Sequence, residues 1–235
     1  ETSPATRADP PKRAHTRGGV DKRGRCRFFM NEAPGRGGGG GLQSYAQSVI
    51  IENSVFAFNS APDSGGAINF HSGHDDAAYY NSSFTATLTN STLYGNQTDG
   101  WGGAIMSSGV PMLYLYNSIL WGNSAVNFLV AGQPTNDMAN LSGSSVTTRY
   151  SDIQTLTWNH GSASEAHTGS FSADPLFVDP DGSDNVAGTE DDNLSIQGFS
   201  PCTDRADGNY APATDIALRS RVDNPSVANQ GTGSP

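Results

Sequence analysis

The chain has 235 residues, of which 35% are apolar, and it contains 28 glycines and 13 prolines. This low apolar fraction argues against one large globular core and favours a repetitive, turn-rich β architecture. The formal net charge of −10 makes nucleic acid an improbable partner, because an acidic surface repels phosphate backbones. The sequence has no apolar run near 18 residues, so we predict no transmembrane segment.

Residues 1–37 form a basic, Gly/Pro-rich segment that differs from the rest of the chain. They hold nine of the 13 basic side chains and four acidic ones, whereas residues 38–235 hold four arginines, no lysine and 19 acidic residues. The segment shows no hydrophobic periodicity, so we predict a disordered arm. Contact between this arm and an anionic surface is the alternative interpretation.

Three segments of 12 residues align without gaps, at 49–60, 86–97 and 113–124. The second and third follow Gly-Gly-Ala-Ile, at 65–68 and 102–105, and the first follows a run of glycines at 37–41. Apolar residues alternate along each segment with the period of a β-strand. The repetition predicts an all-β fold, a right-handed parallel β-helix of about three to four coils over 38–158, rather than a β-sandwich. An irregular, acidic, loop-rich region over 159–235 should follow.

Equivalent side chains of stacked coils should lie on top of one another, about 4.8 Å apart. The positions expected to point inward are Val49, Ala86 and Leu113, with Ile51, Leu88 and Leu115 two residues later. Two asparagine rows should lie at corners and hydrogen-bond along the stack: Asn53, Asn90 and Asn117, and Asn59, Asn96 and Asn123. The second coil is about ten residues longer than the third, which predicts a loop within Asn69–Phe84.

The predicted loop contains two histidines and two aspartates, His71, His74, Asp75 and Asp76. Imidazoles and carboxylates of this kind can ligate zinc or carry out acid–base chemistry. Nothing in the sequence fixes their geometry, so a solvated loop is the simpler interpretation.

Aromatic side chains recur at equivalent positions of the coils. Tyr94 and Trp121 are equivalent, and Tyr114 and Tyr116 lie at outward positions of the third segment. A strip of rings can stack on sugar faces and would then bind a glycan, or it can simply cover the wall of the coil.

An acidic stretch near the C-terminus is the strongest local signal in the chain. Oxygen-rich loops of this kind favour calcium, because the ion offsets the repulsion between carboxylates. The spacing does not match an EF-hand, so a structural calcium site and a solvated acidic loop both remain open. The candidate ligands are Asp179, Asp181, Asp184, Asn185, Glu190, Asp191 and Asp192.

Gly-Gly-Ala-Ile followed by Phe56-Ala57-Phe58-Asn59 resembles the repeats of chlamydial polymorphic outer-membrane proteins and related bacterial right-handed β-helix proteins. In the later copies, Leu93-Tyr94-Gly95-Asn96 and Leu120-Trp121-Gly122-Asn123, leucine replaces phenylalanine. Residues 150–154, 174–180 and 200–204 resemble the closing region of bacterial choice-of-anchor β-helix proteins. The resemblance covers roughly residues 38–235 and implies a secreted or cell-surface protein.

The resemblance implies a non-catalytic module of a bacterial surface protein, adhesive or structural, with surface glycans or proteins as partners. The alternative is a carbohydrate-active protein, since many β-helix proteins are polysaccharide lyases or hydrolases. Lyases of known families usually need lysine or arginine, and residues 38–148 contain neither. The Gly-His-Gly and Arg-x-Lys elements that accompany paired aspartates in β-helix hydrolases are also missing beside Asp75-Asp76. We therefore predict no catalytic residue.

Overall fold

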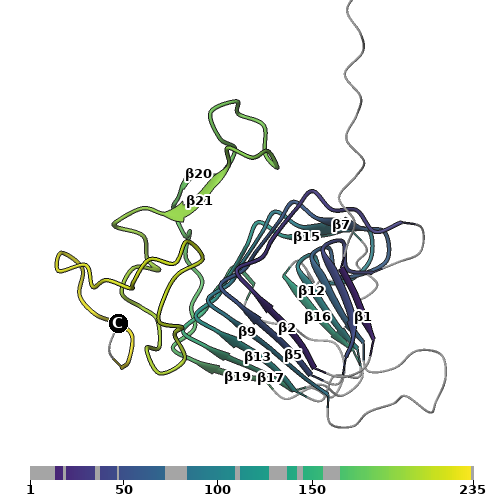
Figure 1. Cartoon of the computed structure of the whole chain (residues 1–235), viewed down its shortest axis with the longest axis horizontal. Coiled ribbons are helices and arrows are strands. Elements are labelled where there is room, and N and C mark those ends of the chain that lie inside the picture. The colour runs from purple at the N-terminus through teal and green to yellow at the C-terminus, as the bar shows by residue number, and fades with distance from the viewer. Residues whose placement is uncertain are drawn as a thin grey trace, which may run out of the picture.

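The computed structural model describes residues 14–17, 20–34, 38–46, 48–71, 84–108, 112–126, 137–141, 145–155 and 165–233. These residues form 21 strands and no helix, which confirms the all-β class. Four sheets contain only parallel strand pairs, and a fifth is a small antiparallel pair. In Figure 1 the parallel sheets lie around a common interior, and the C-terminal part of the chain lies to one side of them.

The first parallel sheet has the order β1 (Ala14–Arg17), β4 (Leu42–Tyr45), β8 (Ile68–His71), β12 (Ile105–Ser108), β16 (Met138–Leu141). The second has the order β2 (Val20–Gly24), β5 (Ser48–Glu52), β9 (Thr85–Thr89), β13 (Met112–Tyr116), β17 (Ser145–Arg149), β19 (Glu165–Thr168). The third has the order β3 (Arg27–Phe29), β6 (Val55–Ala57), β10 (Thr92–Tyr94), β14 (Ile119–Trp121), β18 (Asp152–Ile153). The fourth contains β7 (Ser60–Ala61), β11 (Gln97–Thr98) and β15 (Ser124–Ala125).

The chain visits these sheets in rotation and returns each time beside the strand that it left. We call each such passage a repeat: residues 14–29, 42–61, 68–98, 105–125 and 138–153 are repeats 1 to 5, and together with β19 they form the stack. The register confirms the alignment predicted from the sequence, because Ala86 pairs with both Val49 and Leu113. Most of the stretch in which the loop of repeat 3 was predicted, Asn69–Phe84, lies outside the described residues, at 72–83.

The core consists of the inward side chains of successive strands. The predicted inward residues Val49, Ala86, Leu113, Ile51, Leu88 and Leu115 are all fully buried. A further row comes from the third sheet, with Phe56, Leu93, Leu120 and Ile153 at 0% exposure. Burial of these rows is the main favourable term that holds the repeats together.

A serine follows the corner between the second and third sheets in repeats 2 to 5. The corner residues Asn53, Asn90 and Asn117 have φ of 46°, 50° and 51°, a left-handed conformation that asparagine tolerates better than most residues. The next residues, Ser54, Ser91, Ser118 and Ser151, are buried. The backbone N–H of each of the first three donates to the hydroxyl of the next serine, over 3.1 to 3.2 Å. This serine ladder satisfies corner groups that the sheets leave unpaired.

A second ladder consists of buried asparagines. The Nδ2 of Asn31 donates to Oδ1 of Asn59 at 2.8 Å, and the same bond links Asn59 to Asn96 and Asn96 to Asn123 at 2.9 Å. Asn123 donates in turn to Oδ1 of Asp137 at 3.1 Å, so a carboxyl group ends the ladder. The predicted hydrogen bonding along the Asn59 row is therefore confirmed. Asn53 and Asn117 of the other row instead bond residues outside the stack.

The described part of segment 1–37 differs from the predicted arm, because β1, β2 and β3 lie in it and pair with β4, β5 and β6. The apolar alternation that identifies the later strands is missing from β2, because Asp21 and Arg23 occupy the register positions of Val49 and Ile51. The spacing of Phe28 and Asn31, which repeats that of Phe56 and Asn59, is the signal that identifies repeat 1.

Residues 171–233, which we call the cover, form strands and turns beside the stack, to which Phe171 joins them by a parallel bridge with Asp152. The cover contains the antiparallel hairpin of β20 (Phe177–Asp179) and β21 (Asn193–Ile196), which projects from the body in Figure 1. Phe177 is 8% exposed and packs edge-on against Tyr94, with 5.0 Å between the ring centroids. The hairpin is thereby anchored on the outer face of the third sheet.

Candidate functional site

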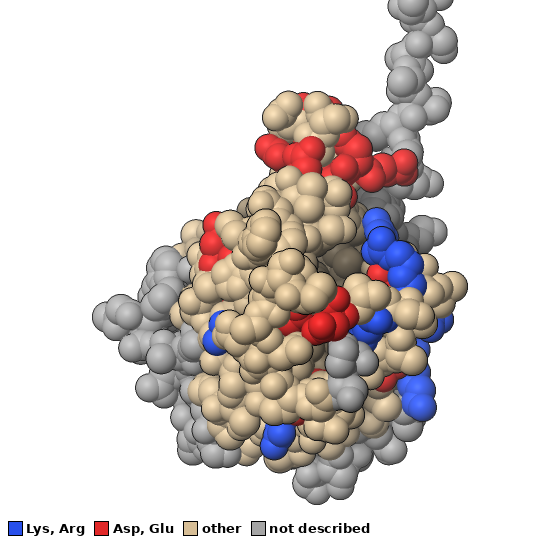
Figure 2. Space-filling model, turned by 90° about the vertical axis from the view of Figure 1, so that its left-hand side faces the viewer, with Lys and Arg blue, Asp and Glu red and all other residues tan. Residues whose placement is uncertain are grey.

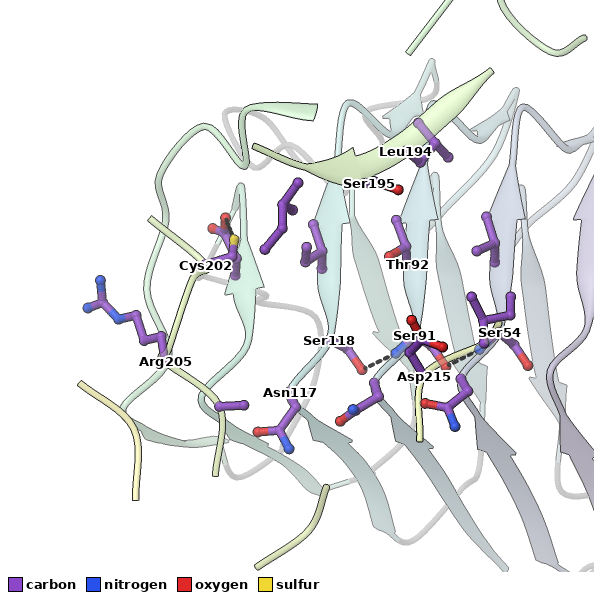
Figure 3. A pocket seen from close by; sticks show the side chains of 18 of the residues that line it. Ser54, Ser91, Thr92, Asn117, Ser118, Leu194, Ser195, Cys202, Arg205 and Asp215 are labelled. Carbon is purple, nitrogen blue, oxygen red and sulfur yellow. Dashed lines mark hydrogen bonds between the residues drawn. The ribbon is translucent and has the colours of Figure 1, made fainter. Parts of the chain in front are cut away.

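A pocket of about 330 Å3 lies between the outer face of the third sheet and the cover, and we call it the side pocket. One wall is a row of outward side chains from neighbouring strands, Val55, Thr92 and Ile119. Leu194 and Ile196 of β21 line the pocket from the cover, and Figure 3 shows β21 crossing the strands of the sheet. The lining residues come from repeats 1 to 5, so the pocket extends along the direction in which the repeats stack.

The corner asparagines tie the cover to three successive repeats. Asn53 Nδ2 donates to the carbonyl of Thr214 at 2.9 Å. Asn117 Nδ2 donates to the carbonyl of Asp207 at 3.0 Å, and the Asp207 N–H donates back to Asn117 Oδ1 at 2.7 Å. The guanidinium of Arg221 lies against the amide of Asn90. The corner row therefore docks the cover.

The side pocket contains charges of both signs. Arg27, Arg205 and Arg221 line it, and so do Asp152, Asp192 and Asp215. Burial lowers the pKa of the Arg221 guanidinium, and Asp215 opposes that shift. Arg205 lies over the ring of Phe171 at 3.7 Å from the centroid, a cation–π contact that holds the guanidinium in place.

Asp152 and Cys202 form a pair at the wall of the pocket formed by repeat 5. The thiol of Cys202 donates to Asp152 Oδ2 at 3.1 Å, and the N–H of Ala173 donates to Oδ1 at 3.0 Å. Burial raises the pKa of Asp152, and these hydrogen bonds oppose the shift. Burial and the neighbouring carboxyl group also raise the pKa of the Cys202 thiol. A thiol held protonated is a poor nucleophile, so this pair fits a structural role better than a catalytic one.

The predicted aromatic residues form two separate groups on different sheets. Tyr94 pairs with Trp121 in register on the third sheet, and its ring lies between Phe58 and Phe177, with centroid distances of 5.3 and 5.0 Å. Gly95 follows Tyr94 with φ of 62°, and a Cβ there would lie 2.7 Å from the Phe58 ring. The cover thus packs directly on Tyr94.

Tyr114 and Tyr116 lie on the second sheet, with centroids 5.8 Å apart, and Tyr210 of the cover lies 4.3 Å from Tyr116. Burial and Tyr210 raise the pKa of Tyr116. His71 ends β8, where its ring lies 5.8 Å from that of Tyr45. His74, Asp75 and Asp76 lie outside the described residues.

The predicted calcium ligands lie in the hairpin, where one aspartate closes the loop. The Asp191 carboxylate accepts hydrogen bonds from Ser183, through both its N–H and its hydroxyl, from the Asp184 N–H and from the Thr189 hydroxyl. The Thr189 and Ser183 hydroxyls hold the pKa of Asp191 well below its ordinary value. Asp192 accepts from the Gly188 N–H at 2.7 Å. Across the described ranges, no three acidic, histidine or cysteine side chains converge as metal ligands.

We expect Asn117→Ala to loosen the cover, because it removes two hydrogen bonds to Asp207 and puts alanine at φ of 51°. A loss of about 2 kcal/mol in local stability should follow. Hydrogen exchange at the Asp207 amide measures it. Asn185→Ala is the matched control, since Asn185 has φ of 55° but is exposed in the hairpin loop. Equal protection of the Asp207 amide in both variants would contradict docking through Asn117.

Sequence reasoning missed the partners of the corner asparagines, because Asp207, Thr214 and Arg221 belong to no repeat. It also missed Asp137, which ends the asparagine ladder although it is not preceded by the repeat motif. The Asn-Ser pair that recurs at 53–54, 90–91 and 117–118 was the available signal that these corners also bind another segment of the chain.

Among the described residues, no helix is long and apolar enough to cross a membrane. Comparisons of the chain with protein-family models, with curated proteins and with solved structures return no match.

Proposed function

We propose that the stack is a right-handed parallel β-helix and that the protein is a non-catalytic module of a secreted or cell-surface bacterial protein. Parallel strands that return beside one another and two side-chain ladders support the architecture. Connections between parallel strands of one sheet are almost always right-handed, which supports the handedness. The repeat motifs that resemble bacterial surface proteins support the location.

The observation that carries the non-catalytic role is that the carboxylates of the side pocket bond the chain itself. Asp152 accepts from Ala173 and Cys202, Asp192 accepts from Gly188, and Asp215 accepts from the N–H groups of Ala217 and Arg219 and from the Arg219 side chain. A general acid or base must instead reach a proton of the substrate. Side chains committed in this way suit an adhesive or structural module that keeps its shape.

A panel of acidic and neutral polysaccharides tests this proposal. The protein should release neither unsaturated products, followed by ultraviolet absorbance, nor new reducing ends. Asp152→Asn and Asp215→Asn accompany the intact protein in each assay. Turnover that either substitution abolishes would overturn the non-catalytic role.

Glycan binding in the side pocket is the second candidate function. Three arginines line this elongated pocket, and an anionic sugar chain could pair with them. Calorimetric titration with uronate oligosaccharides tests it, with Arg205→Gln as the variant and Lys22→Gln, at an exposed residue outside the pocket lining, as the control. Binding that only Arg205→Gln weakens would support this candidate, and no heat of binding would contradict it.

We also propose that calcium binds the hairpin loop in a structural role, supported by its exposed Asp184, Glu190 and Asp191. The ion would have to replace hydrogen bonds that Asp191 accepts. Millimolar calcium should then raise the melting temperature relative to chelator, and Asp184→Asn should abolish the rise. A melting temperature that does not change with calcium would contradict calcium binding.

A further inference from the structure

We propose that β3, the terminal strand of the third sheet among the described residues, binds an extended acidic segment of another polypeptide as one additional parallel strand below the tip of the hairpin. This interaction uses the edge of β3 rather than the side pocket, although Arg27 and Phe29 line both spaces, and it does not depend on the proposed surface location. It follows from the strand order, the cavity at this end and the charges around it.

Repeat 1 ends three of the parallel sheets. In the part of the chain that the structure describes, β1, β2 and β3 are the terminal strands of the first, second and third sheets. The edge of a terminal strand presents backbone groups that another strand can pair with. The regular pairing of β3 with β6 shows which geometry an added strand would continue.

The interior rows also stop at repeat 1. The ring of Phe28 stacks on Phe56 with centroids 4.4 Å apart and 9° between the planes, and Phe28 is only partly buried. Asn31 donates to Asn59, and each later asparagine of the ladder accepts from the one before it. Within the described ranges Asn31 has no earlier ladder member. A further strand would place an apolar side chain on Phe28 and an amide on the Asn31 oxygen.

A cavity of about 620 Å3 lies at this end, and its size is within the range of ligand sites. Arg27, Phe28, Phe29 and Asn31 line it from the stack. Gly188, Thr189 and Glu190 of the hairpin loop line it from the other side. Gly188 packs closely on Met30, since a Cβ at Gly188 would lie 2.4 Å from the Met30 sulfur. The tip of the hairpin therefore covers a cavity that borders β3.

The charge of repeat 1 favours an acidic strand, although Glu190 of the hairpin loop lines the cavity from the other side. Lys22, Arg25 and Arg27 are exposed on repeat 1. Figure 2 shows a group of basic side chains on one side of the body, below the acidic side chains of the projecting hairpin. Two copies of this chain joined edge to edge would bring the same basic groups together, and like charges repel. An acidic strand would instead pair with them.

The register gives the sequence preferences of the partner. The residues opposite Arg27 and Phe29 would face outward and should be acidic, and the residue opposite Phe28 should be apolar. Met30, like Gly95 and Gly122, has a positive φ, so glycine suits the residue of the partner that lies opposite Met30. An asparagine opposite Asn31 would extend the ladder. The expected core of the partner is thus Asp-Leu-Asp-Gly-Asn.

Fluorescence anisotropy of a labelled peptide with Asp-Leu-Asp-Gly-Asn at its centre, titrated with the intact 235-residue chain, tests the proposal. We expect saturable binding that salt weakens. Replacing both aspartates of the peptide with lysine should weaken binding about tenfold, and so should replacing its asparagine with alanine. Because these changes are in the peptide, they leave folding of the protein unaffected.

Two matched protein variants locate the interaction. Arg25→Gln, at an exposed residue of repeat 1 that does not line the side pocket, should weaken binding of the acidic peptide several-fold, whereas Arg219→Gln, in the cover and 73% exposed, should leave it unchanged. Equal effects of the two variants, equal binding of the acidic and lysine peptides, or no saturable binding at millimolar peptide would each overturn the proposal. Anionic polysaccharide that binds better than the peptide at this end would assign the charges to a different partner and also overturn it. None of these outcomes bears on turnover in the polysaccharide assay, so the proposed function stands or fails separately.

Discussion

Asn96→Ala should destabilise the protein by about 4 kcal/mol and lower its melting temperature by roughly 10 °C. The Asn96 amide accepts from Asn59, through both its side chain and its backbone N–H, and donates to Asn123 and to the Phe56 carbonyl. The residue is completely buried, so alanine leaves polar partners that water cannot reach. A cost of about 1 to 3 kcal/mol for each unsatisfied group gives the expected size.

Chemical denaturation followed by circular dichroism measures the free energy of unfolding for Asn96→Ala. Asn229→Ala is the control, since Asn229 is exposed in the cover and its amide bonds only the exposed side chain of Asp223. This control should change stability by less than about 0.5 kcal/mol. If the two variants lose similar stability, the ladder does not hold the repeats together in the way described.

Raising the pH from about 5 to 8 should destabilise the protein by a few kcal/mol through Asp137. Burial raises the pKa of this carboxyl group from 3.8 to about 7, and hydrogen bonds from Asn123 and Thr155 oppose the shift. The nearby carboxyl group of Asp152 raises the pKa of Asp137 further. The folded state therefore holds the proton more tightly than the unfolded state. The stabilisation is complete below about pH 4 and is lost as the pH rises toward 7.

A shift of this size corresponds to about 4 kcal/mol in total, and roughly two-thirds of it falls above pH 5. Asp137→Asn should remove this pH dependence, because an amide does not titrate over the range. Melting temperatures at several pH values test it, with Asp63→Asn as a control at an exposed carboxylate. The wild type and the control should lose roughly 10 °C between pH 5 and 8, beyond any change in Asp137→Asn. Parallel curves for all three proteins would contradict the assignment.

The alternation of apolar and polar residues was sufficient to predict the stacked strands. It did not predict the partners of the corner residues. Val49, Ala86 and Leu113 could be aligned because a strand has a period of two and the copies repeat without gaps. The same logic located Asn96 in a hydrogen-bonded row. The strands of repeat 1 were not predicted from the sequence. They are terminal strands with one neighbour each, and β2 has charged residues at positions where the later repeats have apolar ones.

Long-range contacts to irregular segments follow from no local pattern. Asn117 bonds Asp207, which lies 90 residues later in a stretch of turns. Asp137 precedes β16 and completes a row built by residues of another corner. The acidic loop was recognised by its composition. That Asp191 closes this loop depends on the positions of Ser183 and Thr189 in the folded hairpin.

The contacts of the cover affect how the protein unfolds. Repeats that touch only their neighbours can separate one at a time from the end of an array. Here Asn53, Asn117 and Arg149, from three different repeats, all bond the cover. Separating two neighbouring repeats must also detach this shared segment, which couples their stabilities. The stack should therefore unfold in one cooperative transition, and during synthesis the early repeats should gain their full stability only after residues near 207 to 221 have emerged.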